Sequence, residues 1–274
     1  MQLYINNHVI EPQINQSLLD IVKSLGYIKG HLSTDPLVAK IAGRIFTLNY
    51  IPKRANKTVK DRKSIQAALK ASGGHVKLIG YEDPLGREAY IKTAQFVIFL
   101  AFHRLYPDAI AKMSCTLGNS INFKVSNINS FSVDNLIVEM QNIVTKDIPL
   151  IKRQVPLDEA ISYYKTTNQV DKTRLLKYRA KQYFSVYEYE GFADYFYGEM
   201  APSTGFLRAW KLVAAPNGFT FILPDIENPD HITEYNEMPN FFNVYAEGET
   251  WSELMGCETV ADLNELTENG KIYE

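Results

Sequence analysis

The sequence predicts an α+β fold, in which helices are mixed with mostly antiparallel strands. Short runs of alternating apolar and polar residues lie beside turn residues, and stretches with helical apolar spacing lie between them. The 274 residues are enough for two domains. Charge separates two parts as well: residues 1–83 hold 12 basic against 6 acidic residues, and residues 84–274 hold 17 against 25. We therefore predict a basic domain over 1–83 and an acidic one over 84–274.

Residues 1–83 predict a small β-grasp domain. Strand-like residues alternate around two asparagines in 2–10, which indicates a hairpin. A helix follows from Ser17, with Asp20 three residues later in a capping-box arrangement. Two further strands are expected over 37–48. Hairpin, helix and strands in this order are typical of a β-grasp unit.

Residues 84–274 predict a larger α+β domain. A turn-rich junction at 81–88 precedes an almost wholly apolar helix over 91–106. The elements expected after it are strands and turns over 116–133, a helix capped by Asp134, a helix opened by Pro156, a short helix capped by Asp171, a strand over 182–190, a hairpin joined at Pro216-Asn217-Gly218 and a last helix capped by Thr259 and Asp262.

The residue content excludes several classes of protein. Cys115 and Cys257 are too few for a disulfide scaffold or a four-thiolate zinc site. The N-terminus lacks the pattern of a signal peptide, and the longest apolar run, 96–102, is too short to span a bilayer. We therefore expect a cytoplasmic protein with no membrane contact.

No catalytic motif stands out. A phosphate-cradling G-x-x-x-x-G-K-[ST] loop is absent, as are G-x-S-x-G and H-E-x-x-H, and the five histidines show no metal-ligand spacing. The basic segment 52–63 could contact phosphates, although it has no aromatic residue to stack on a base. A solvated loop explains the same segment. The tyrosine-rich segment 183–200 is likewise open to two interpretations, a base-stacking platform or a half-buried strand.

Several segments resemble known domains. The segments LYINNHVIEP, SLLDIVKSLG and VAKIAGRIFTL resemble a TGS domain, the β-grasp module at the N-terminus of threonyl-tRNA synthetases. Further on, AFHRLYPDA, DNLIVEMQNIVTKDIPL and PLDEAISYY resemble the editing-type second domain of those synthetases. The closer resemblance, carried by DKTRLLKYR, DYFYGEMAPSTGFL, GFTFILP and VADLNEL, is to bacterial uridine-kinase-like proteins, which combine both domains with a P-loop kinase domain.

This resemblance implies a parent that transfers the ATP γ-phosphate to a nucleoside, a transferase using ATP and Mg²⁺. The kinase domain would begin just after NGKIYE, so the chain is expected to be the front half of a longer protein, with that domain as its partner in cis. Without a phosphate-binding loop the chain itself cannot catalyse this transfer. We expect no cofactor in this chain and no catalytic residue.

The resemblance also identifies four positions of the editing site. Synthetase editing domains carry H-x-x-x-H on the helix and a later cysteine and histidine. The corresponding residues here are Lys92, Phe96, Phe196 and Met200. Phenylalanine has no lone pair, lysine must first lose a proton, and methionine is a soft ligand poorly suited to zinc. We therefore predict no metal and no deacylation of aminoacyl-tRNA.

These four positions leave two alternatives, an apolar pocket for a base or nucleoside and a hole filled by core. The candidate ligand contacts beyond the four positions are Lys172, Tyr178, Arg179, Asp194, Tyr195, Tyr197 and Gly198. Our main hypothesis is a non-catalytic module that binds a nucleoside or nucleotide, or regulates the kinase domain. The alternatives are a free-standing aminoacyl-tRNA editing hydrolase and an RNA-binding module.

Overall fold

The computed structural model describes residues 2–53, 61–167, 169–179, 182–232, 234–235 and 239–271. By contact density the chain forms two compact units, Met1–Ile151 with Tyr187–Thr233, and Lys152–Val186 with Glu234–Glu274. The fold is α+β with mainly antiparallel sheets, as predicted. The predicted boundary at residue 83 does not coincide with this division by contacts and stays a prediction.

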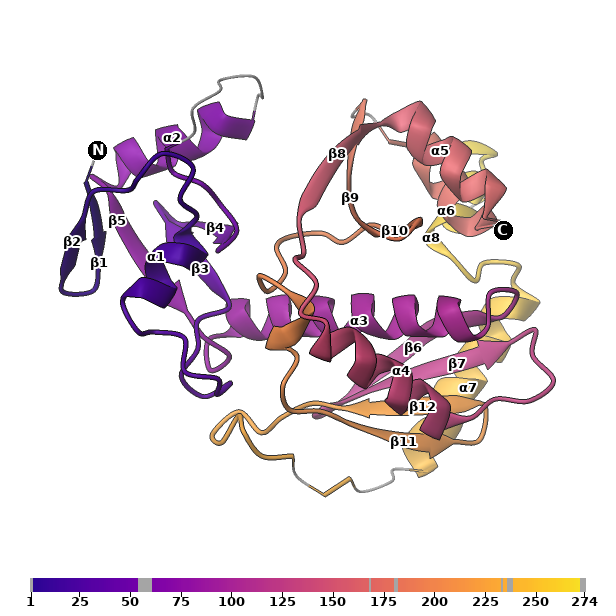
Figure 1. Ribbon diagram of the computed structural model, residues 1–274. Helices are drawn as coiled ribbons and strands as arrows, with labels where there is room; N and C mark the ends of the chain where they lie inside the picture. The colour runs from indigo at the N-terminus through magenta and orange to yellow at the C-terminus, as the bar shows by residue number, and fades with distance from the viewer. Residues whose placement is uncertain are drawn as a thin grey trace. The chain divides into compact units, whose positions relative to one another are not determined.

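The N-terminal part of the first unit is built on a five-stranded sheet of order β2-β1-β5-β3-β4 (Figure 1). Its elements are β1 (Leu3–Ile5), β2 (His8–Ile10), α1 (Leu18–Ser24), β3 (Val38–Ile41), β4 (Arg44–Thr47), α2 (Asp61–Ala71) and β5 (His75–Ile79). The capping box between Ser17 and Asp20 is present, as predicted. The helix α2 was not predicted, because its basic residues conceal a short apolar face that includes Leu69.

A long helix, α3 (Pro84–Leu105), begins seven residues before its predicted start at 91. Residues 81–83 of the expected junction form a turn, as predicted, whereas Pro84 and Gly86 belong to the helix itself. Asp83 is the N-cap, with its Oδ1 accepting a hydrogen bond from the Leu85 amide at 2.9 Å, and Pro84 is the first helical residue. Gly86 lies so close to Gly80 that a Cβ would fall 1.9 Å from its carbonyl oxygen.

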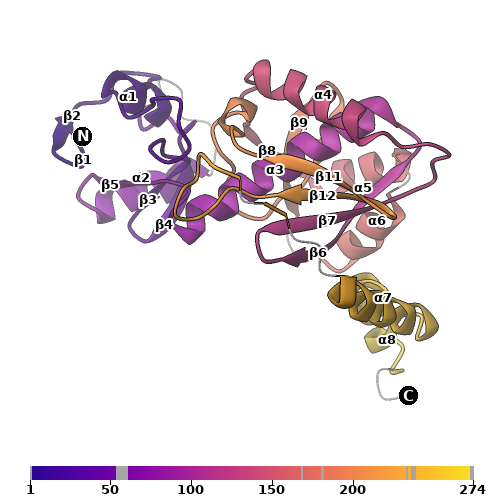
Figure 2. The ribbon, with the colours of Figure 1, turned by 90° about the horizontal axis from the view of Figure 1, so that it is seen from below.

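A four-stranded sheet of order β11-β12-β7-β6 carries α3 and α4 on one of its faces (Figures 1 and 2). The elements are β6 (Ile110–Leu117), β7 (Ser120–Ser126), α4 (Val133–Thr145), the short η1 (Thr204–Phe206), β11 (Lys211–Ala215) and β12 (Gly218–Ile222). Ser132, not Asp134, is the N-cap of α4, because its hydroxyl accepts from the Asn135 amide at 3.2 Å. Phe123, Phe219 and Phe221 pack between this sheet and the helices.

The second unit is mostly helical. Its elements are β8 (Lys152–Pro156), α5 (Leu157–Thr166), α6 (Val170–Lys177), the first residues of β9 (Tyr183–Tyr189), α7 (Pro239–Leu254) and α8 (Val260–Glu268). The strand β9 also pairs with β8 and with β10 (Phe192–Asp194). The predicted capping box of Thr259 and Asp262 is confirmed. Gln169, not Asp171, precedes the first residue of α6, and α7 was not predicted.

Candidate functional site

Three of the four positions of the editing-like site come together between α3 and the segment 192–201. Phe96 on α3 meets the rings of Phe192 and Phe196 edge-on, at centroid distances of 5.8 and 6.4 Å. Phe96 is 0% exposed and Met200 is 1% exposed, and both belong to the same hydrophobic core. Phe196 is partly buried against that core. The apolar members of the site therefore pack as interior side chains.

Thr93 of α3 explains why the segment 192–201 lies so close to this helix. Its hydroxyl accepts a hydrogen bond from the Ala201 amide at 3.0 Å and donates one to the Ala89 carbonyl at 2.9 Å. Each of these polar groups is thus satisfied in an apolar surrounding. This link holds Met200 beside the helix.

The fourth position, Lys92, is occupied differently. Its ammonium forms an ion pair with Glu88, one helical turn earlier, and its side chain is only 14% exposed. Gly198 lies against this ammonium with φ +91°, and a Cβ there would stand 2.5 Å from Nζ. The positive charge expected to face a ligand is therefore compensated by a neighbouring carboxylate.

Of the polar candidates around this site, Asp194 and Tyr195 are held within the segment. Asp194 is buried, and its Oδ1 accepts from the Tyr195 amide at 2.8 Å. The Tyr195 and Tyr197 rings meet edge to face at 5.6 Å, and Tyr197 is 67% exposed. Burial raises the pKa of nearby Tyr187 far above its usual range, so this hydroxyl stays neutral.

The candidates on α6 and after it belong to the second unit and contact aromatic rings or carboxylates there. The Lys172 ammonium is 5.3 Å from the Tyr164 ring centre, and the Arg179 guanidinium is 4.9 Å from that of Phe184. The Tyr178 hydroxyl donates to Glu268 at 2.8 Å, and this hydrogen bond raises the pKa of Tyr178. A phosphate would have to compete with these contacts.

Carboxylates of α8 also neutralise the best anion-binding group on α6. Arg174 donates to both carboxylate oxygens of Glu265, at 3.0 and 2.7 Å, and forms an ion pair with Asp262 at 2.7 Å. The hydrogen bond to Glu265 raises the pKa of Arg174 further above its usual range. Such a bidentate pair fixes the helices to each other and leaves α6 poorly suited to hold a phosphate.

The segment PSTGFL, part of the family-like motif, has a structural role that sequence analysis missed. Thr204 Oγ1 donates to the Ile143 carbonyl and accepts from the Ile148 amide. These hydrogen bonds satisfy one backbone group in the last turn of α4 and one just beyond the helix. The Asp147 carboxylate accepts from the Ser203 hydroxyl and from the Gly205 amide. A Cβ on Gly205 would lie 2.2 Å from that carboxylate, so the glycine is needed for packing.

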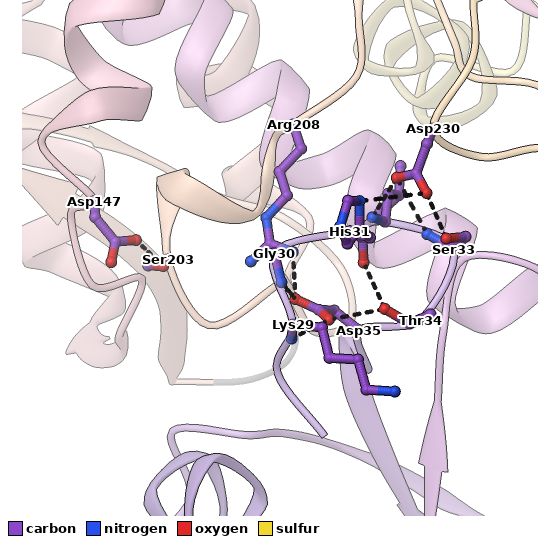
Figure 3. A network of polar contacts seen from close by, with 11 residues as sticks. Lys29, Gly30, His31, Ser33, Thr34, Asp35, Asp147, Ser203, Arg208 and Asp230 are labelled. Atoms are coloured by element: carbon purple, nitrogen blue, oxygen red, sulfur yellow. Dashed lines mark hydrogen bonds and ion pairs between the residues drawn. The ribbon is translucent and has the colours of Figure 1, made fainter. Parts of the chain in front are cut away.

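A second polar network joins the loop 29–35 to residues after η1 (Figure 3). Asp35, fully buried, accepts from the amides of Lys29 and Gly30 at 2.7 and 3.1 Å and pairs with Arg208. Burial opposes its ionisation, but these hydrogen bonds outweigh that effect and lower the pKa of Asp35. Asp230 accepts in the same way from the Leu32 amide at 2.7 Å. Both carboxylates therefore hold the backbone of the loop 29–35 in place.

Metal-binding residues do not gather in the described part of the chain: no three histidine, cysteine, aspartate or glutamate residues there are placed to hold an ion. In the same part, none of the helices combines the length and hydropathy needed to cross a bilayer. Most of the basic run 52–63 lies outside the described residues.

The comparisons find threonine–tRNA ligases. The chain is 26% identical over 212 residues to that of Carboxydothermus hydrogenoformans, covering 76% of this chain and 30% of the ligase. For Clostridium kluyveri the identity is 25% over 218 residues, 78% of this chain and 31% of the ligase. For Fusobacterium nucleatum it is 30% over 148 residues, 50% of this chain and 23% of the ligase. No protein-family model matches.

These relatives support a region related to the TGS and editing-like part of threonyl-tRNA synthetases. The alignments span less than a third of the length of each of these three ligases. They give no support to a uridine-kinase-like parent, so the kinase domain in cis stays a prediction. Of the hypotheses from the sequence, the two that involve tRNA fit the relatives better than the kinase module does.

Proposed function

We propose that the chain is an RNA-binding module, related to the N-terminal region of threonyl-tRNA synthetases, that does not hydrolyse aminoacyl-tRNA. One observation carries the proposal. The chain resembles threonine–tRNA ligases over about three quarters of its length, yet core packing and an ion pair occupy the four editing-like positions. Binding of a nucleic acid depends on phosphate and base contacts and does not require hydrolytic groups at these four positions.

The chemistry at the four positions argues against hydrolysis. Ester hydrolysis needs a group that activates water, whether a general base or a metal ion. Phe96 and Phe196 have no lone pair to offer, and Met200 is sealed in the core. Lys92 is paired with Glu88. The proposed binding requires no metal and no organic cofactor.

The charge distribution favours RNA contacts in the N-terminal part. Residues 1–83 carry a net charge of +6, whereas residues 188–274 hold 17 acidic against 3 basic residues. Phosphate contacts supply most of the sequence-independent affinity for nucleic acids, so the acidic C-terminal part is a poor surface for RNA. A cytoplasmic location belongs to the same proposal, since tRNA is found there.

Binding of fluorescently labelled tRNA, measured at increasing salt, tests this function. We expect the logarithm of the association constant to fall linearly with the logarithm of salt concentration, because each phosphate contact releases counterions. A deacylation assay on mischarged tRNA should show no hydrolysis above the uncatalysed rate. If tRNA fails to bind at low salt, the module is not an RNA binder. If hydrolysis occurs and disappears in Lys92→Ala, the editing hydrolase is the better description.

A further inference from the structure

The five-stranded sheet has two faces with different environments. Leu18 of α1 and Leu69 of α2 pack with Leu3 and Ala39 on one face and form its core. Among the described residues, Val38, Ile45 and Ile79 on the other face pack against Leu85 and Ala89 of α3. The strands alternate, so Tyr4, Lys40, His75 and Lys77 point to this second face. We name these four residues the open sheet face.

An aromatic pair occupies one part of the open sheet face. Tyr4 and His75 are register partners on the parallel strands β1 and β5, and their rings stack at 4.9 Å with an interplanar angle of 23°. Gly74 allows this approach, because a Cβ there would fall 2.2 Å from the Gln2 carbonyl oxygen. His75 is exposed, so the stack presents a ring to solvent. The glycine pair before His75 therefore positions an aromatic surface.

Two lysines adjoin this stack. Lys40 and Lys77 are register partners on the antiparallel strands β3 and β5, and like charges at such positions repel each other. Within the part of the chain that the structure describes, neither lysine has a carboxylate in ion-pair distance. Lys77 follows His75 by two residues on the same strand, which puts it about 7 Å along the same face. An anion beside the aromatic stack would relieve the repulsion.

We propose that the open sheet face binds unpaired nucleotides of an RNA, with a base stacked on the Tyr4–His75 pair and phosphates held by Lys40 and Lys77. The inference rests on the proposed RNA-binding function and assigns it a site. Stacking platforms combined with a cationic groove are how single-stranded nucleic acids are bound without sequence preference. A base stacked within a duplex does not offer its face to a protein ring, so single-stranded segments or ends are the expected ligand. A free nucleotide has the same chemistry, and the test separates the two.

The test uses the full chain with a labelled single-stranded RNA of nine nucleotides, and with tRNA. His75→Ala and Tyr4→Leu should each weaken binding of the oligonucleotide between about fivefold and about 150-fold, the range found for removing one base–aromatic stack. Lys40→Gln combined with Lys77→Gln should reduce the salt slope by about 1.4, since each phosphate contact on a single strand contributes about 0.7. Circular dichroism confirms that each variant is folded.

Matched controls are available at exposed positions elsewhere. Tyr183→Ala removes an exposed tyrosine, and Lys70→Gln removes an exposed lysine from α2, which covers the opposite face of the sheet. Both should bind RNA as the unmodified chain does. If the three open-face variants also bind normally while tRNA affinity is retained, this site is wrong and the proposed function stands.

Two other outcomes overturn the inference differently. If the unmodified chain binds neither RNA, the proposed function fails and this site with it. If a free nucleoside monophosphate competes as effectively as the oligonucleotide at equal nucleotide concentration, the face binds a small molecule and not RNA. Support requires that the oligonucleotide binds more tightly than the monophosphate and that this binding depends on the stack and on both lysines.

Discussion

In both the editing-like site on α3 and the open sheet face, regular spacing along the chain brings side chains to one face. The first face is buried, and the second is open to solvent at His75 and Lys77. Lys92 and Phe96 are one helical turn apart, as the family's histidines are, yet a neighbouring segment covers Phe96 completely. His75 and Lys77 are two residues apart on a strand, and both remain exposed. Spacing thus brings side chains to a common face, while the segment that packs on that face decides whether a ligand can reach them.

The reason lies in how many sides of each element are covered. The helix α3 lies between a sheet and the segment 192–201, so its apolar residues are buried on several sides. Within the described residues, the five-stranded sheet has two helices packed on one face, and the start of α3 packs on part of the other. Substitutions in the first region should therefore change stability, and substitutions in the second should change binding.

The largest effect on stability is expected at the editing-like site, where Phe96 is buried. Phe96→Ala should lower the free energy of unfolding by about 3–5 kcal/mol, because it removes a buried ring and leaves a cavity. Urea unfolding followed by circular dichroism measures this change. Tyr197→Ala, at an exposed ring of the same region, should change it by about 0.5 kcal/mol at most. A loss below about 1 kcal/mol at Phe96 would indicate an open pocket there.

A charge reversal on the open sheet face should weaken RNA binding and at the same time stabilise the folded protein. Lys77→Glu should weaken RNA binding by about tenfold or more, because it replaces a phosphate contact with a repulsion. In the free protein the same substitution puts opposite charges across β3 and β5, which should stabilise the fold by about 0.2–1 kcal/mol. Anisotropy titrations and urea unfolding measure the two quantities. A parallel loss of both would show that Lys77 acts through the fold.

A smaller effect on stability is expected at Gly198, whose backbone lies against the Lys92 ammonium. Gly198→Ala should cost about 1–2 kcal/mol, since the left-handed backbone at φ +91° disfavours a Cβ. Gly248→Ala is the control: this glycine lies within α7 with open space around it, so alanine should stabilise by about 0.5–1 kcal/mol. Thermal unfolding compares the two variants. Equal effects would contradict the assigned backbone strain.

The smallest effect is expected in acid, at the contact of α6 and α8. Hydrogen bonds from Thr259 and then Arg174 lower the pKa of Asp262 from 3.8 to about 2. The folded pKa is below the unfolded one, so this stabilisation is complete above about pH 4 and is lost as the pH falls to about 2. The protection of α8 amides against hydrogen exchange should fall across this window, and Asp262→Asn should reduce this pH dependence. The remainder comes from Glu265 and Glu268, whose pKa values are lowered by hydrogen bonds from Arg174 and Tyr178. RNA binding at neutral pH should not change in this variant.

Local features of the fold could be predicted from the sequence, and features set by distant segments could not. The capping boxes at Ser17 and Thr259 each join residues three apart, so the chain itself specifies them. The start of α3 was placed too late because Asp83 and Pro84 are equally common in turns. The helix α2 was missed because its charge hides its apolar face.

The candidate site shows the same limit. The four editing-like positions followed from the resemblance to synthetase editing domains, and their residue types then predicted that they would be poor metal ligands. Neither the closure of that site by Met200 and Phe196 nor the ion pair of Lys92 with Glu88 could be established before the structure. His75 and Tyr4 were not selected as site residues, because they are 71 positions apart in the sequence and only the β1–β5 register makes them neighbours.

The sequence by itself determined the α+β class and the contrast between a basic N-terminal and an acidic C-terminal part. Periodicity and residue chemistry act between close neighbours in the chain, so these properties need no folded partner. Only the tertiary structure decided which aromatic and cationic side chains are covered. Burial and strand register depend on segments far apart in sequence, and for that reason Arg174 is neutralised by α8, while Lys40 and Lys77 are register partners, the first half-buried and the second exposed.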